Sequence, residues 1–221
     1  MDPIRFRTED GLHLEGELRL PEGSAAASAV LCHPHPRHGG SKDHPLLWAI
    51  RNDLAARGLA VLVFNFRGVM GSEGTYGEGT AEKADVRAAV GTVRQRVDGP
   101  TLVCGWSFGA HVALSTALGD ERISALALLG PPLGEAPIQL PEWPGRAELK
   151  GFDRPVLLLS GEADQFCPLP ELRALSRKLP HATVRTVSDA DHFFWRRERE
   201  TAKIVGDFAE EALLGGQLSR G

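Results

Sequence analysis

Five short apolar runs, each followed by a dozen or more residues of mixed polarity, constrain the fold of this chain more than any other feature. The runs cover residues 29–32, 60–66, 101–105, 123–129 and 155–160. Continuous apolar character is typical of strands that are buried on both faces of a parallel sheet. Consecutive parallel strands need crossovers of about a dozen residues or more, and these are usually helices. The runs therefore predict an α/β fold, in which residues 183–187 form a further strand.

The rest of the pattern adds an antiparallel edge and the crossover helices. Residues 4–7 and 12–20 alternate apolar and polar side chains around the turn dipeptide Asp10-Gly11, which predicts a β-hairpin. We expect residues 1–221 to form a single domain, with helices on both faces of a twisted, mostly parallel, eight-stranded sheet that carries this antiparallel hairpin at its N-terminus. Helices are expected at residues 45–57, at 80–97 with Thr80 as the N-cap, and at 108–118, 170–178 and 197–214.

One segment breaks the alternation of strands and helices. Residues 130–154 contain five prolines, whose spacing excludes a long helix. The segment is short for a full helical lid. We expect a small lid-like excursion over a fairly open pocket, which favours small or short-chain substrates.

Composition and charge restrict the partners. A net charge of -4 gives no broad basic surface for nucleic acid. No stretch reaches the roughly 18 apolar residues that a membrane span needs, so we expect no membrane partner. Cys32, Cys104 and Cys167 are odd in number and far apart, which favours reduced thiols and a cytoplasmic location. A small molecule is the expected partner, and the oligomeric state is left open.

The run that begins at residue 101 ends in a serine between two glycines, Gly105-Trp106-Ser107-Phe108-Gly109, and then continues as a helix. A sharp turn from strand to helix exposes a serine hydroxyl at the sheet edge, where a base can activate it as a nucleophile. Glycine at the two flanking positions tolerates the close approach of the folded-back backbone. The pattern predicts a nucleophile elbow at Ser107.

Two further loops place an acid and a base at the same edge. Asp164 follows the run that ends at residue 160, and His192 follows the strand at 183–187. Asp164 alone could be a turn residue, and Asp189 and Asp191 are alternative acids that share the loop of His192. The order Ser, Asp, His in this strand context resembles the α/β-hydrolase superfamily over nearly the whole chain. The resemblance implies that His192 is the general base for Ser107 and that Asp164 orients its imidazole.

The stretch His33-Pro34-His35-Pro36 admits two interpretations. Closely spaced histidines suggest a metal site, but neither a carboxylate nor a cysteine completes a ligand set, so neither metal nor cofactor is expected. The resemblance instead implies an oxyanion hole made by the backbone N–H groups of His35 and Phe108. This stretch and residues 64–72 are similar to small bacterial hydrolases related to dienelactone hydrolases and serine esterases. Arg67, Ser72 and Glu73 are expected to brace the neighbouring loop.

The expected function is that of a serine hydrolase that cleaves small carboxylic esters or thioesters through an acyl-enzyme. Two alternatives remain at this stage: a non-catalytic binding protein on the same scaffold, and a serine peptidase or acyltransferase. Aromatic side chains near the loops are candidates for an apolar acyl-binding site, although many aromatic residues belong to the core. These candidates are Trp106, Trp143, Phe166 and Phe193, with Trp195 nearby.

Overall fold

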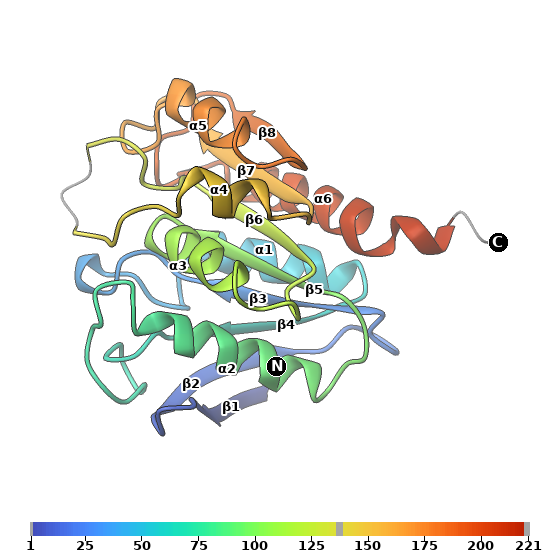
Figure 1. The fold of residues 1–221 in the computed structure, drawn as a ribbon. Coiled ribbons are helices and arrows are strands. Elements are labelled where there is room, and N and C mark those ends of the chain that lie inside the picture. The colour runs from blue at the N-terminus through green and yellow to red at the C-terminus, as the bar shows by residue number, and fades with distance from the viewer. Residues whose placement is uncertain (1, 136–138, 219–221) are drawn as a thin grey trace.

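The computed structural model describes residues 2–135 and 139–218, and this part of the chain contains the eight-stranded sheet shown in Figure 1. The strands are β1 (Asp2–Arg7), β2 (His13–Arg19), β3 (Ala27–Cys32), β4 (Leu59–Phe64), β5 (Thr101–Trp106), β6 (Ala125–Leu129), β7 (Val156–Gly161) and β8 (Ala182–Val187). Their order is β1-β2-β4-β3-β5-β6-β7-β8. Strand β2 runs antiparallel to β1 and β4, and the other pairs are parallel. The predicted mostly parallel sheet with an N-terminal hairpin is confirmed.

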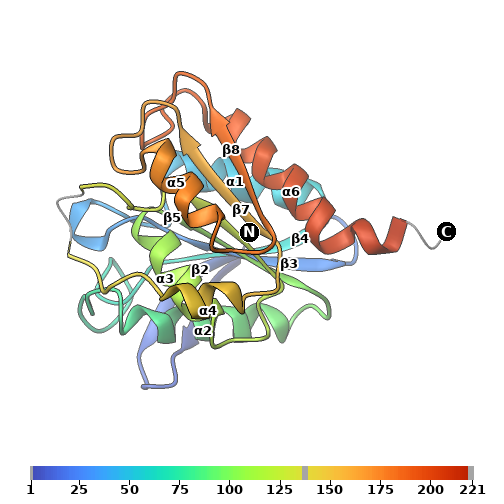
Figure 2. The same cartoon turned by 45° about the horizontal axis from the view of Figure 1, so that its top comes forward.

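Helices cover both faces of the sheet, as expected. Helices α1 and α6 pack together on one face, whereas α2, α3, α4 and α5 lie on the other (Figure 2). Strands β3 to β7 are buried along their whole length between two apolar cores, which explains their continuous apolar sequences. The helices are α1 (Pro45–Ala56), α2 (Glu82–Arg94), α3 (Phe108–Ala117), α4 (Arg146–Lys150), α5 (Leu169–Ser176) and α6 (Glu198–Leu218).

The register of the parallel strands brings several loops to one edge of the sheet. Cys32 at the end of β3 lies opposite Gly105 of β5, and Leu129 at the end of β6 lies opposite Trp106. Leu129 also pairs with Leu159 of β7. The loops after these strands therefore leave the sheet side by side, which is where ligands bind in open α/β sheets.

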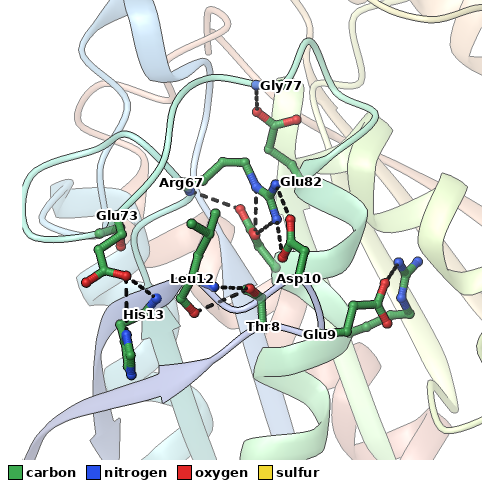
Figure 3. A network of polar contacts seen from close by, with 12 residues as sticks. Thr8, Glu9, Asp10, Leu12, His13, Arg67, Glu73, Gly77 and Glu82 are labelled. Atoms are coloured by element: carbon green, nitrogen blue, oxygen red, sulfur yellow. Dashed lines mark hydrogen bonds and ion pairs between the residues drawn. The ribbon is translucent and has the colours of Figure 1, made fainter.

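The loop at residues 67–81, which follows β4, is fastened to the turn of the N-terminal hairpin (Figure 3). The Arg67 guanidinium donates to Asp85 Oδ1 from Nε at 2.9 Å and from Nη2 at 2.6 Å. Its Nη1 donates to Asp10 Oδ2 at 2.8 Å. The Asp85 side chain is fully buried, so the pair of Arg67 and Asp85 joins the loop to α2 in the interior, whereas the half-exposed Asp10 joins Arg67 to the hairpin turn.

Two carboxylates hold the rest of this loop. Glu73 accepts a hydrogen bond from the His13 backbone N–H at 2.8 Å, which confirms that it braces the loop. Glu82 accepts from the backbone N–H of Gly77 at 2.7 Å (Figure 3) and from that of Gly79 at 2.9 Å. The expected cap at Thr80 is wrong, because the N-cap position of α2 is residue 81 and it makes no side-chain capping bond. Glu82 instead organises the chain that enters the helix.

His33 is a buried structural residue that links the ends of β3 and β4. Its Nδ1 lies 2.6 Å from the Pro34 carbonyl oxygen, and its Nε2 lies 3.0 Å from the Phe66 backbone nitrogen. The backbone N–H can only donate, so Nε2 is the acceptor and Nδ1 carries the hydrogen. Burial disfavours the imidazolium and lowers the pKa of His33 to about 4.

This lowered pKa predicts a loss of stability in acid. Unfolded histidine titrates near pH 6.5, so the unfolded chain binds more protons than the folded chain between about pH 6.5 and 4. The stabilisation from neutral His33 is complete above that range and is lost as the pH falls through it. Between pH 7.5 and 5.0, the unfolding free energy of the wild type should decrease by about 2 kcal/mol more than that of His33→Asn. Urea unfolding at both pH values measures this difference, and equal decreases would contradict the assignment.

The proline-rich segment at residues 130–154 contains only the short helix α4 among its described residues, so the prediction that it forms no long helix is confirmed there. Residues 136–138 of the expected excursion lie outside the described part. None of the helices in residues 2–135 and 139–218 combines the length and apolar character that a membrane crossing requires.

Candidate active site

Ser107 sits at a strained turn between β5 and α3. Its φ of 54° and ψ of -115° are values that side-chain-bearing residues rarely adopt, and its backbone N–H donates to Leu129 O at 2.8 Å. A Cβ at Gly105 would overlap with the Gly109 carbonyl oxygen, and a Cβ at Gly109 would overlap with the Cys32 carbonyl oxygen. Both glycines are therefore required by close backbone contacts, and the turn has the geometry predicted for a nucleophile elbow.

The structure brings Ser107, His192 and Asp164 together in one chain of hydrogen bonds. His192 Nε2 lies 2.9 Å from Ser107 Oγ, and His192 Nδ1 lies 2.8 Å from Asp164 Oδ2. The Asp164 carboxylate can only accept a hydrogen bond, so His192 Nδ1 carries the hydrogen, and His192 Nε2 is free to accept the Ser107 proton. All three residues are more than nine-tenths buried. This arrangement can activate a serine hydroxyl as a nucleophile.

The Asp164 carboxylate is oriented by donors from its own loop. Its Oδ1 accepts the backbone N–H groups of Phe166 at 2.9 Å and Cys167 at 3.0 Å, and Ser160 Oγ donates to its Oδ2 at 3.3 Å. These bonds fix the plane of the carboxylate against the imidazole of His192. Asp164 thus combines the two interpretations of the sequence, because it closes a turn and contacts the histidine.

The two alternative acids do not contact the ring of His192. Asp191 accepts the backbone N–H of Phe193 at 2.9 Å, and Asp189 pairs with Arg197 at 3.4 Å. Both carboxylates therefore shape the loop that carries His192.

Gly130 is a site residue that the sequence interpretation missed. It follows β6 with a φ of +47°, and a Cβ there would lie 3.0 Å from Asp164 Oδ2 and 3.1 Å from His192 Nδ1. The backbone of Gly130 therefore forms a wall against the pair of His192 and Asp164. The available signal was a glycine directly after a buried strand at the edge where the site was expected.

Gly130→Ala is expected to lower the activity of Ser107 as a nucleophile by about tenfold or more, because the added methyl group displaces His192 from Ser107. The positive φ adds about 1–2 kcal/mol of destabilisation. Gly58→Ala is the matched control, since Gly58 has a φ of +89° but open space around its Cβ position. Activity and urea unfolding of both variants measure the two effects. A loss of stability that is similar in both, with unchanged activity in Gly130→Ala, would show that the methyl group does not reach the site.

The His35 loop lies beside the elbow with a free backbone donor. Among the hydrogen bonds of the described residues, neither the His35 N–H nor the Phe108 N–H has an acceptor. Gly40 permits the loop to turn back, because a Cβ there would overlap with the Pro34 carbonyl oxygen. The His35 ring is engaged at both nitrogens, with the Arg37 N–H at Nδ1 and the Tyr76 hydroxyl at Nε2. These contacts give the ring a structural role within the loop.

The aromatic candidates for an acyl-binding site separate into two groups. Phe166 and Phe193 flank His192, with ring centroids 5.0 Å and 5.6 Å from the imidazole, and Phe193 is 43% exposed. Trp106 does not fit this role, because it is 1% exposed in the core and its indole N–H donates to the His192 carbonyl oxygen. Successive side chains of a strand point to opposite faces of the sheet, and Trp106 points to the face that α1 and α6 cover.

Trp143 lies in a different hollow. It packs edge-on against His111 at 4.7 Å and lines a cavity of about 690 Å³ between α2, α3 and the proline-rich segment. The lining includes neither Ser107 nor His192, so Trp143 is not a wall of the site at the elbow. Trp195 is exposed and lies 5.9 Å from the half-buried ring of His44.

Comparison with known proteins gives consistent matches. A family model for an alpha/beta hydrolase domain matches residues 27–212. An uncharacterized protein of Rickettsia prowazekii is 26% identical over 216 residues, which cover 94% of this chain and 88% of that protein. The crystal structure of XC6422 from Xanthomonas campestris, an α/β serine hydrolase without a lid, superposes with a TM-score of 0.79 at 26% identity and covers 96% and 95% of the two chains. An alpha-beta serine hydrolase homologue from Coxiella burnetii gives a TM-score of 0.81 at 27% identity over 93% and 96%.

Proposed function

This chain belongs to the α/β-hydrolase family, and from that premise we propose that it is a serine hydrolase that cleaves small carboxylic esters or thioesters through an acyl-enzyme intermediate. The observation that carries the proposal is the 2.9 Å contact between Ser107 Oγ and His192 Nε2, with Asp164 bound to the other ring nitrogen. The structural relatives in Xanthomonas and Coxiella, which are described as serine hydrolases or their homologues, support the same class of reaction.

In the first half of the reaction, Ser107 Oγ forms a bond to the carbonyl carbon while its proton passes to His192 Nε2. The carbonyl oxygen becomes an oxyanion, and we assign its stabilisation to the N–H groups of Phe108 and His35. Asp164 stabilises the imidazolium through Nδ1–H. The intermediate then expels the alcohol or thiol, which takes the proton from His192, and Ser107 remains acylated.

In the second half, a water molecule attacks the acyl carbon and gives its proton to His192. The Oγ–acyl bond breaks, Ser107 recovers the proton, and the carboxylic acid leaves. The same groups therefore act twice and return to their starting state.

Substrates of small size agree with the surroundings of the site. Phe166 and Phe193 offer apolar surface on either side of His192. The segment at residues 130–154 contains no helix longer than α4 among its described residues. We therefore expect activity to decrease with long acyl chains.

A fluorophosphonate probe tests the reaction class directly. The wild type should form a covalent adduct at Ser107, identified by peptide mass spectrometry, and a panel of p-nitrophenyl esters, acyl-CoA thioesters and aminoacyl amides should rank the substrates. Faster cleavage of the amides would favour a peptidase. Transfer of the acyl group to an added alcohol instead of water would favour an acyltransferase. An intact protein that neither reacts with the probe nor hydrolyses any ester would be a binding protein on this scaffold.

A further inference from the structure

Tyr76, the single tyrosine of the chain, connects the two backbone donors of the proposed oxyanion hole. Its hydroxyl oxygen lies 3.0 Å from His35 Nε2. Its ring lies 5.0 Å from the ring of His35 and 5.7 Å from that of Phe108, and the Arg37 guanidinium covers it at 4.7 Å. No step of the reaction above uses this side chain.

The direction of the hydrogen bond follows from the other nitrogen of the imidazole. His35 Nδ1 accepts the Arg37 backbone N–H at 3.1 Å, so Nε2 carries the hydrogen and donates to Tyr76 Oη. Burial, with the neighbouring His38 and Arg37, lowers the pKa of His35 to about 4, and burial raises the pKa of Tyr76. Both groups are therefore neutral around pH 7, and the bond keeps one direction throughout the neutral range.

The loop that carries Tyr76 is held in place by polar contacts. The next residue, Gly77, donates its backbone N–H to Glu82 at 2.7 Å, and a Cβ at Gly77 would overlap with the Ala81 side chain (Figure 3). The base of the loop is held by the buried pair of Arg67 and Asp85. These contacts hold the Tyr76 hydroxyl in place, and the His35 ring is oriented by its hydrogen bond to that hydroxyl.

In the described part of the chain, the backbone of His35 is held by hydrogen bonds on one side only. It lies between Pro34 and Pro36, and its carbonyl oxygen accepts the N–H groups of His38 at 3.0 Å and Gly40 at 3.1 Å. These bonds hold the carbonyl side of the residue, whereas its N–H has no partner in the described structure. The ring is held at Nδ1 by the Arg37 N–H, and the bond from Nε2 to Tyr76 is the contact that ties it to a different loop.

We infer that Tyr76 is a positioning residue that aims the His35 backbone N–H at the substrate oxyanion through its hydrogen bond to the His35 ring. The inference rests on the proposed function, because an oxyanion forms only if Ser107 attacks a carbonyl. It differs from a packing role, since the ring contacts with Phe108 and Arg37 do not need the hydroxyl group.

Tyr76→Phe isolates the hydroxyl and keeps the ring. Removal of an oxyanion donor costs about 10²–10³ in rate, so a loosened donor should lower kcat for p-nitrophenyl acetate by about ten- to a hundredfold. KM should change little, because the donor acts mainly on the oxyanion. Ser176→Ala is the control, since in the described part of the chain the hydroxyl that it removes is hydrogen-bonded only to Arg173 O within α5. An unchanged kcat in a folded Tyr76→Phe variant would overturn the inference.

A double-mutant cycle with His35→Ala tests the route through the ring. If Tyr76 acts through that ring, Tyr76→Phe should cause no further loss of kcat in the His35→Ala background. An equal loss in both backgrounds would refute the route.

Binding of a short alkyl boronic acid, which adds to Ser107 as a tetrahedral anion, provides a readout without turnover. Its inhibition constant should rise in Tyr76→Phe by the same factor by which kcat/KM falls. Incorporated 3-fluorotyrosine gives one ¹⁹F resonance, which should shift when the boronic acid binds. A wild type that fails to react with the fluorophosphonate would refute the proposed function. A reactive wild type with an unaltered boronic acid affinity in Tyr76→Phe would refute only the role of Tyr76.

Discussion

Alanine in place of Ser107 is expected to lower kcat/KM for p-nitrophenyl acetate by about 10⁴-fold or more, because Ser107 supplies the oxygen of the proposed acyl-enzyme. The fold should remain intact. Ser107 makes no side-chain capping bond to α3, and among the described residues its Oγ is hydrogen-bonded only to His192. Steady-state hydrolysis and far-UV circular dichroism measure the two outcomes.

Ser115→Ala is the matched control for this substitution. Ser115 lies two turns further along α3, and its side chain makes none of the hydrogen bonds found at the elbow. Its variant should hydrolyse the ester at the wild-type rate. If Ser107→Ala retained more than about a hundredth of the activity, the attacking group would have to be another residue.

Methionine in place of Arg67 is expected to destabilise the protein by about 3–5 kcal/mol, because it leaves the fully buried Asp85 carboxylate without its cation. The Arg67 side chain is itself 6% exposed, so water cannot replace the lost bonds without opening the loop. Urea unfolding at neutral pH measures the change. The added substitution Asp85→Asn should recover part of it, since it removes the buried charge and keeps an acceptor for the backbone N–H of residue 67.

Arg87→Met provides the comparison. Arg87 pairs with Glu9 on the same side of the hairpin turn, but the two side chains are 35% and 61% exposed. An exposed pair contributes about 1 kcal/mol or less. Equal decreases in the unfolding free energy of Arg67→Met and Arg87→Met would mean that burial does not determine how much the Arg67 pair stabilises the protein.

Part of the site could be predicted because its signals are local. The apolar runs indicate strands, and a serine between two glycines after such a run indicates the sharp turn at Ser107. Asp164 and His192 were found because parallel strands end at one edge, so residues that follow different strands become neighbours. The sequence could not show what the rings of His33 and His35 bind, because the Phe66 backbone N–H and the Tyr76 hydroxyl that contact them are distant in the sequence.

The residues that the sequence interpretation misplaced or missed depend on the direction of a side chain or on contacts between distant segments. Trp106 is adjacent to Ser107 in the sequence, yet the strand turns it into the opposite core. Trp143 is near the expected lid, yet it packs against His111 over a separate cavity. Gly130 and Tyr76 belong to the site only because β6 lies beside β5 and the loop at residues 67–81 folds over Phe108.

The sequence by itself determined the α/β architecture, the turn at Ser107 and a short set of candidate acids with one base, because hydrophobic periodicity and backbone restrictions act over a few residues. Only the tertiary structure decided which acid contacts His192, which aromatic side chains stand beside it and what holds the His35 loop. Those relations depend on distances between segments that are far apart in the chain, and strand register and packing set these distances.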